Sequence, residues 1–179
     1  MADKKGRGTY SIEVDPVEFK NLLGLLGSFP AEYQQLVRDR ALPLSKRLAG
    51  QLMMSAQGAP APQTKLVAQT IVAKRDRLIR VDIGGPKKVG RKYGGEASKS
   101  GKGNRVRQNA APAGALLWGT EYGSHGGVDS IGRVFTNRFK TSYNKRGYWI
   151  APAVDYYVPI IAREYALMVQ QIADELRFK

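Results

Sequence analysis

Two long stretches of the chain carry apolar residues at the three- and four-residue spacing of an amphipathic helix. The first opens near Ser28 or Phe29-Pro30 and ends at Gly58, and its apolar positions are Tyr33, Leu36, Val37, Leu44, Leu48 and Leu52. The second is the clearest helix of the chain, and its apolar positions are Val154, Val158, Ile161, Tyr165, Met168, Ile172 and Leu176. Each helix is therefore predicted to bury one face.

A shorter helix is predicted to precede the first long one. Asp15-Pro16-Val17-Glu18 places an N-cap aspartate, a proline suited to the first helical position and an acid where a capping box has one. Gly27 is a natural stop for this helix. Residues 1–14 before it are interpreted as an N-terminal arm.

Strand patterns fill most of the remaining chain. The residues from Thr64 to Ala73 turn β-branched and apolar, and Leu78 to Ile83 alternates apolar and charged side chains, which together predict a half-buried β-hairpin. Further short strands are expected near 115–122, 133–140 and 146–150. Two helices, a hairpin, a small antiparallel sheet and a long C-terminal helix make an α+β fold, with residues 15–179 forming a single domain.

Length and composition narrow the class of protein. The chain has 179 residues, enough for one domain with its own core. It has no cysteine, which excludes disulfides, thiolate nucleophiles and cysteine zinc sites. Its most apolar stretch, Tyr148 to Ala162, is broken by two prolines and an aspartate, so no membrane partner is expected.

The formal net charge of +14 is concentrated in two places. Residues 74–107 hold twelve cations and three acids, and residues 133–146 hold five cations and no acid. Much of the first cluster lies in a Gly-, Ser- and Lys-rich segment over about 84–113, interpreted as a flexible basic loop within the domain. The candidate contact residues of this loop are Lys87, Lys88, Arg91, Lys92, Lys99, Lys102, Arg105 and Arg107.

Two interpretations of the basic loop are open. Its cations can bind nucleic-acid phosphates without sequence preference, through counterion release. Alternatively, the loop is a surface arm that folds against an acidic neighbouring subunit. Both interpretations make the loop an interaction element.

Catalytic chemistry is not expected from this sequence. The single histidine, His125, lies in a Gly-rich turn, and a general base must be held rigidly near its proton donor. The glycine-rich stretch Gly85 to Lys92 has arginine and lysine where a phosphate loop needs lysine and a hydroxyl residue. The acids are scattered. We therefore predict no enzyme, no cofactor and no metal.

Two motifs in the second half resemble a known family. Trp118-Gly119-Thr120-Glu121-Tyr122-Gly123 is similar to its glutamate–aromatic–glycine segment, and the residues from Arg146 to Ala153 are similar to its segment of Arg-Pro-Phe, apolar residues and Pro-Ala. The chain resembles the tailed-phage neck proteins named for gene product ten of phage Hong Kong 97. It departs from them in Gly147, where they usually have proline, and in a longer, more basic 84–113 loop.

The resemblance implies a structural virion protein of the neck, in head–tail joining or tail completion. Such a protein is expected in a homo-oligomeric ring, a hexamer or a dodecamer, between the capsid connector and the tail, assembled in the host cytoplasm. Its implied partners are neighbouring connector and tail proteins, and double-stranded DNA in the channel. A tail-terminator ring and a nucleic-acid-binding protein of ribosomal or nucleoid type are the alternatives.

Within the two motifs, structural roles are expected for the bulky and acidic residues. Tyr148, Trp149 and Ile150 enter a helix whose first turn suits Pro152, so a strand end and a packing corner against the hairpin are predicted. Glu121 is expected either to cap or to pair with a cation such as Arg146. The structural motif residues are Trp118, Glu121, Tyr122, Gly123, Tyr148, Trp149 and Pro152.

Overall fold

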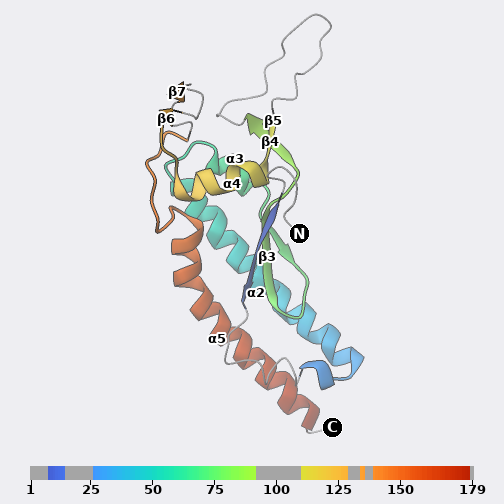
Figure 1. The fold of residues 1–179 in the computed structure, drawn as a ribbon. Coiled ribbons are helices and arrows are strands. Elements are labelled where there is room, and N and C mark those ends of the chain that lie inside the picture. The colour runs from blue at the N-terminus through green and yellow to red at the C-terminus, as the bar shows by residue number, and fades with distance from the viewer. Residues whose placement is uncertain (1–7, 15–25, 92–109, 129–133, 136–138, 178–179) are drawn as a thin grey trace, which may run out of the picture.

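The computed structural model describes residues 8–14, 26–91, 110–128, 134–135 and 139–177. Two 28-residue helices, α2 (Ala31–Gly58) and α5 (Ile150–Arg177), run side by side and set the length of the molecule (Figure 1). Both predicted long helices are thus confirmed. The short predicted helix lies largely outside the described residues, which include only its helical end at 26–28.

A three-stranded antiparallel sheet in the order β1-β3-β2 packs beside the helices (Figure 1). The strands are β1 (Thr9–Val14), β2 (Val72–Lys74) and β3 (Ile79–Gly84). β3 alternates buried and half-exposed residues, with Ile79, Val81 and Ile83 facing the core, so the second strand of the predicted hairpin is confirmed. Residues 9–14, expected within an arm, instead pair with β3 in the register Thr9↔Gly84 to Val14↔Ile79.

Two segments predicted as strands are helices. Thr64–Ala68 is α3, where Thr64 and Val67 are buried, so the first hairpin strand is only three residues long. Ala113–Tyr122 is α4, which replaces the strand expected near 115–122. No strand lies at 146–150, where a turn leads directly into α5. Of the strand expected over 133–140, β7 (Val134–Phe135) is a strand, paired with β6 (Gly127–Val128), whereas Phe139 and Lys140 lie in a turn.

The ends of the expected 84–113 loop are ordered as a two-stranded ribbon. β4 (Lys88–Arg91) pairs antiparallel with β5 (Ala110–Pro112), and residues 92–109 between them lie outside the described chain. The ribbon lies at the same end of the molecule as α3 and α4, whereas the C-terminus of α5 lies at the opposite end (Figure 1). The fold is α+β, as predicted.

The core lies between α2, α5 and the inner face of the sheet. On α5, buried residues recur at the helical spacing, and Tyr165 lies among them with no exposed area. The Tyr165 hydroxyl donates a hydrogen bond to the backbone carbonyl of Arg77, at 2.6 Å. This bond ties the middle of α5 to the turn that connects β2 and β3.

Burial raises the pKa of Tyr165 to about 12. Because a phenol in the unfolded chain titrates near pH 10, folding favours the protonated form; this stabilisation is complete below pH 10 and is lost as the pH rises towards 12. We expect Tyr165→Phe to lower the free energy of unfolding by about 1 kcal/mol at pH 8, through the lost hydrogen bond. The difference from the wild type should shrink above pH 10 in denaturant titrations. Parallel pH profiles of the two proteins would contradict this assignment.

Candidate assembly surfaces

The two motifs that carry the family resemblance meet at the start of α5. The Glu121 carboxylate, buried at the end of α4, accepts backbone hydrogen bonds from Trp149 (3.2 Å), Ile150 (2.7 Å) and Ala151 (2.8 Å). The first N–H groups of a helix have no partner within the helix, and the helix dipole favours a negative charge there. Of the two roles left open for Glu121, the structure therefore shows the cap. No ion pair joins it to Arg146 in the described chain.

Backbone hydrogen bonds hold the same two segments together along their length. Tyr148 donates to the Glu121 carbonyl and Asn144 to the Tyr122 carbonyl, both at 2.8 Å. Ser124 donates to the Thr141 carbonyl at 3.0 Å. The end of α4 and the segment before α5 consequently form one hydrogen-bonded corner, built from residues 17 to 27 positions apart in the chain.

Two glycines make this close approach possible. Gly123 has a φ of +74°, and a Cβ added to it would lie 2.1 Å from the Ser142 carbonyl oxygen. Gly147 has a φ of +77°, and its added Cβ would lie 2.0 Å from a Glu121 carboxylate oxygen. Proline holds φ near −65°, so it cannot adopt the conformation of Gly147. The geometry of the corner therefore requires glycine at position 147, where the family usually has proline.

The bulky residues of the second motif are structural, although not as a strand. Trp149 has no exposed area and lies in the core immediately before α5, and Pro152 occupies the first turn of that helix. The Tyr148 hydroxyl donates a hydrogen bond to the Ser142 carbonyl at 2.9 Å. These contacts fix the direction in which α5 leaves the corner.

An aromatic patch on the outside of the corner is exposed. Trp118 of α4 stacks on Tyr122, with ring centroids 5.8 Å apart, and meets the edge of Tyr10 of β1 at 5.4 Å. Trp118 retains 53% of its accessible surface. Beside these rings lies a hollow of about 200 Å³, lined also by Ile150, Ala151, Val154 and Asp155 of α5. We call Tyr10, Trp118, Tyr122 and this hollow the aromatic groove.

The structure describes only part of the predicted basic loop. Lys87 and Lys88 are exposed at the base of the β4–β5 ribbon, and Arg91 ends β4. The other candidate contacts lie outside the described residues: Lys92, Lys99, Lys102, Arg105 and Arg107. Whether these cations contact DNA or protein stays a prediction.

Part of the second cationic cluster lies on the corner itself. Lys140, Lys145 and Arg146 are exposed on the segment between Phe139 and α5, next to Tyr143, whose ring lies 5.4 Å from His125. None of the three cations has an ion pair within the described part of the chain. In contrast, several cations of α2 and the sheet pair with acids, among them Arg40–Glu175, Arg47–Glu164 and Arg75–Asp39.

Acids balance only part of the positive charge of the described residues. The Arg75 guanidinium, hydrogen-bonded to Asp39 at 2.7 Å, lowers the pKa of that carboxyl below its usual value. This pairing and the two arginine–glutamate pairs lie along α2 and α5, where Lys46 and Arg163 are exposed without an ion pair in the described residues. Lys140, Lys145 and Arg146 are further unpaired cations near α4. Uncompensated cations near α4 favour an acidic or phosphate-rich partner at that end.

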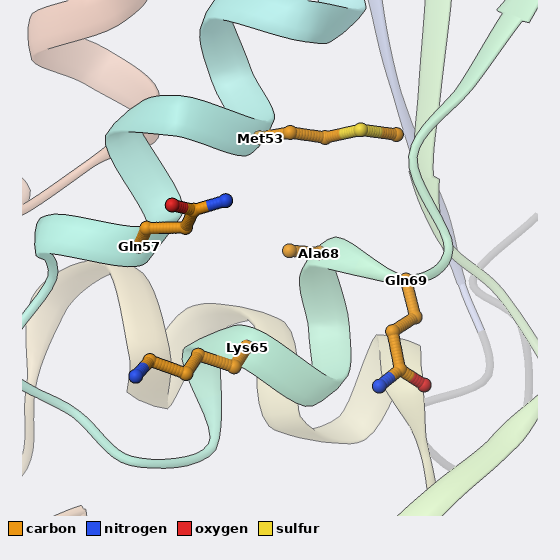
Figure 2. A pocket seen from close by; sticks show the side chains of 5 residues that line it. All are labelled: Met53, Gln57, Lys65, Ala68 and Gln69. Atoms are coloured by element: carbon orange, nitrogen blue, oxygen red, sulfur yellow. The ribbon is translucent and has the colours of Figure 1, made fainter.

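A second hollow, of about 510 Å³, lies between α2 and α3. Met53 and Gln57 of α2 and Lys65, Ala68 and Gln69 at α3 line it (Figure 2). Figure 2 shows Met53 extended across its upper side, with the amides of Gln57 and Gln69 well apart. The lining offers no pair of groups arranged for acid–base or nucleophilic chemistry.

Comparisons with protein-family models, curated proteins and solved structures found no match to this chain. Among the described residues, no group of three or more His, Cys, Asp or Glu side chains could hold a metal ion. The helices in the described ranges include none long and apolar enough to cross a bilayer.

Proposed function

We propose that this chain is a structural subunit of a tailed-phage neck, in the ring that joins the capsid portal to the tail. The observation that carries the proposal is the corner formed by Glu121. It joins the two motifs of the family resemblance into one hydrogen-bonded unit that leaves the aromatic groove exposed. Exposed aromatic side chains are typical of protein interfaces. The role is assembly in the virion, without catalysis.

The distribution of charge supports a place beside the DNA channel. Repeating a +14 chain around an axis makes a strongly positive collar, and the exposed lysines and arginine near α4 would add to that charge at their end of the molecule. Contacts with phosphates alone carry no sequence information, which suits a genome that must pass through the ring.

Particle composition tests the proposed role. A phage deleted for this gene should accumulate DNA-filled heads and separate tails, and supplying the gene in trans should restore joined particles. Intact tailed particles from the deletion strain would sink the proposal. Joined tails of irregular length in that strain would instead favour the tail-terminator alternative.

Replacement of residues 92–109 by a short Gly-Ser linker tests the basic loop. The change removes five cations and one acid and few apolar side chains, so we expect the free energy of unfolding to change by less than about 1 kcal/mol. If the loop contacts DNA, affinity for random duplex should fall and its salt dependence should weaken.

The control keeps the length of the loop and changes its five cations to glutamine: Lys92, Lys99, Lys102, Arg105 and Arg107. Equal losses of DNA affinity in both variants assign the effect to charge. Loss of cooperative unfolding in the linker variant would mean that the segment is part of the core. Unchanged DNA binding in both variants would assign the loop to a protein neighbour.

The second candidate function is non-specific nucleic-acid binding by a cellular protein, which the exposed cations near α4 favour. Such a protein should bind random duplex tightly as a monomer, with a steep salt slope. A neck subunit should self-associate and copurify with particles. Sedimentation of the purified protein with and without duplex DNA separates the two.

A further inference from the structure

The outer face of α5 carries an apolar stripe that stays exposed, although the ring of Tyr156 contacts that of its neighbour Tyr157, with centroids 4.9 Å apart. Tyr156, Ile160 and Leu167 retain 66%, 39% and 65% of their accessible surface. Their spacing of four and seven residues places them on one line along the helix. The line faces away from the buried positions of the same helix, which include Ile161, Tyr165 and Val169. Large apolar side chains aligned in this way mark an interaction surface.

The stripe and the aromatic groove lie on different sides of α5. At about 100° per residue, the stripe points roughly opposite to Ile150, Ala151, Val154 and Asp155, which line the groove. One surface is a convex helix face and the other is hollow. Because the two surfaces point in different directions, one neighbouring molecule cannot contact both of them in a single orientation.

The two surfaces carry complementary charges. Arg163 is exposed between Ile160 and Leu167 on the stripe, and Asp155 is exposed at the groove. Neither residue has an ion pair within the described residues. Stripe against stripe offers Arg163 no acidic partner, and in a parallel alignment it would place Arg163 against its own copy, where like charges in contact are costly. Stripe against groove would pair Arg163 with Asp155.

We propose that the α5 stripe of one copy docks in the aromatic groove of a second copy, with Arg163 of the first facing Asp155 of the second. The contact uses two different patches, so it is heterologous: it continues from copy to copy and closes only as a ring. This inference deepens the proposed neck function and rests on it for ring closure alone. The head-to-tail contact itself is a property of the purified protein.

Charge exchange tests the pairing without disturbing the core, since both side chains are exposed. Arg163→Glu alone and Asp155→Arg alone should each weaken self-association at least tenfold, measured by sedimentation velocity and native mass spectrometry. The double variant in one chain should restore it. An equimolar mixture of the two single variants should also associate, because each contact then joins opposite charges, and its closed rings should contain even numbers of subunits.

Lys46→Glu is the matched control, because it reverses an exposed charge on α2, away from both surfaces. It should leave association unchanged. Leu167→Glu should weaken association, whereas Met54→Glu, at an equally exposed apolar residue of α2, should not. Circular dichroism must show unchanged helix content in every variant.

The proposal is overturned if the wild type stays monomeric up to about 1 mM, the concentration at which even a weak contact of 4 kcal/mol is half formed. It is also overturned if the single variants associate like the wild type, or if neither the double variant nor the mixture recovers. These outcomes are separate from the fate of the neck function. A chain found in necks that fails the charge exchange uses other surfaces, whereas a chain that passes it but is absent from particles forms its oligomer elsewhere.

Discussion

Glu121→Ala should lower the free energy of unfolding by about 3 kcal/mol, measured by chemical denaturation followed by circular dichroism. The variant loses three hydrogen bonds to a charged acceptor. The first backbone N–H groups of α5 are then left without that acceptor. A helix cap alone contributes about 1 kcal/mol, and a bond to a charged group about 1.5 to 3. Burial adds to the cost, because the N–H groups of Trp149 and Ile150 lose a charged acceptor in a buried setting.

Glu164→Ala provides the control for this prediction. It removes a carboxylate of α5 that bonds Arg47 at the surface, so its effect should be within about 0.5 kcal/mol. Glu121→Gln, which keeps one acceptor oxygen, should lie between the two. A loss below about 1 kcal/mol in Glu121→Ala would mean that the corner does not depend on the cap.

Gly123→Ala should destabilise the protein by about 3 kcal/mol or more. The backbone at Gly123, φ +74° and ψ −163°, lies in a region that only glycine adopts readily, and strain there costs about 1 to 3 kcal/mol. The new methyl group would also meet the Ser142 and Thr141 carbonyl oxygens at 2.1 and 2.8 Å. These are backbone atoms held by the Ser124–Thr141 hydrogen bond, so they cannot move without opening the corner.

Gly50→Ala makes the same chemical change where neither constraint applies. Gly50 lies inside α2, and a Cβ there meets nothing within 4 Å. Since alanine is the better helix former, the variant should be more stable by about 0.5 to 1 kcal/mol. Thermal unfolding of the two alanine variants should therefore shift in opposite directions. Shifts of the same sign would contradict the assigned geometry of Gly123.

The helices α2 and α5 and the strand β3 could be predicted because their signals are local. Apolar residues at helical spacing and the alternation of Ile79, Val81 and Ile83 each follow from which face is buried. The start of α2 at Ala31 and its end at Gly58 agree with the predicted boundaries. These elements make up most of the core.

Helix α4 was mistaken for a strand because its apolar run has no clear period. Its buried positions recur at helical spacing, but Thr120 and Glu121 among them are polar, and the large apolar side chain of Trp118 is exposed. The apolar residues alone therefore do not show the helical period. A short apolar run of this kind does not distinguish helix from strand. The high helix propensities of alanine and leucine were the signal that favoured the helix.

The sequence does not show which strand pairs with β1 or which N–H groups bind Glu121. β1 pairs with a strand some 70 residues away, and nothing in its own sequence specifies that partner. Glu121 bonds N–H groups 28 to 30 residues ahead, and only the folded corner brings them within reach. The stripe on α5 has no distinguishing sequence signal, because its exposed residues Tyr156, Ile160 and Leu167 are as apolar as the residues that the same helix buries.

Cryo-electron microscopy of the assembled particle tests the central claim most directly. The proposed function predicts a ring of copies of this chain in the neck, into which α2, α5 and the three-stranded sheet fit as one unit. In that ring, the outer face of each α5 should meet the aromatic groove of the next copy. A neck fully accounted for by other chains, together with monomeric purified protein, would contradict the claim.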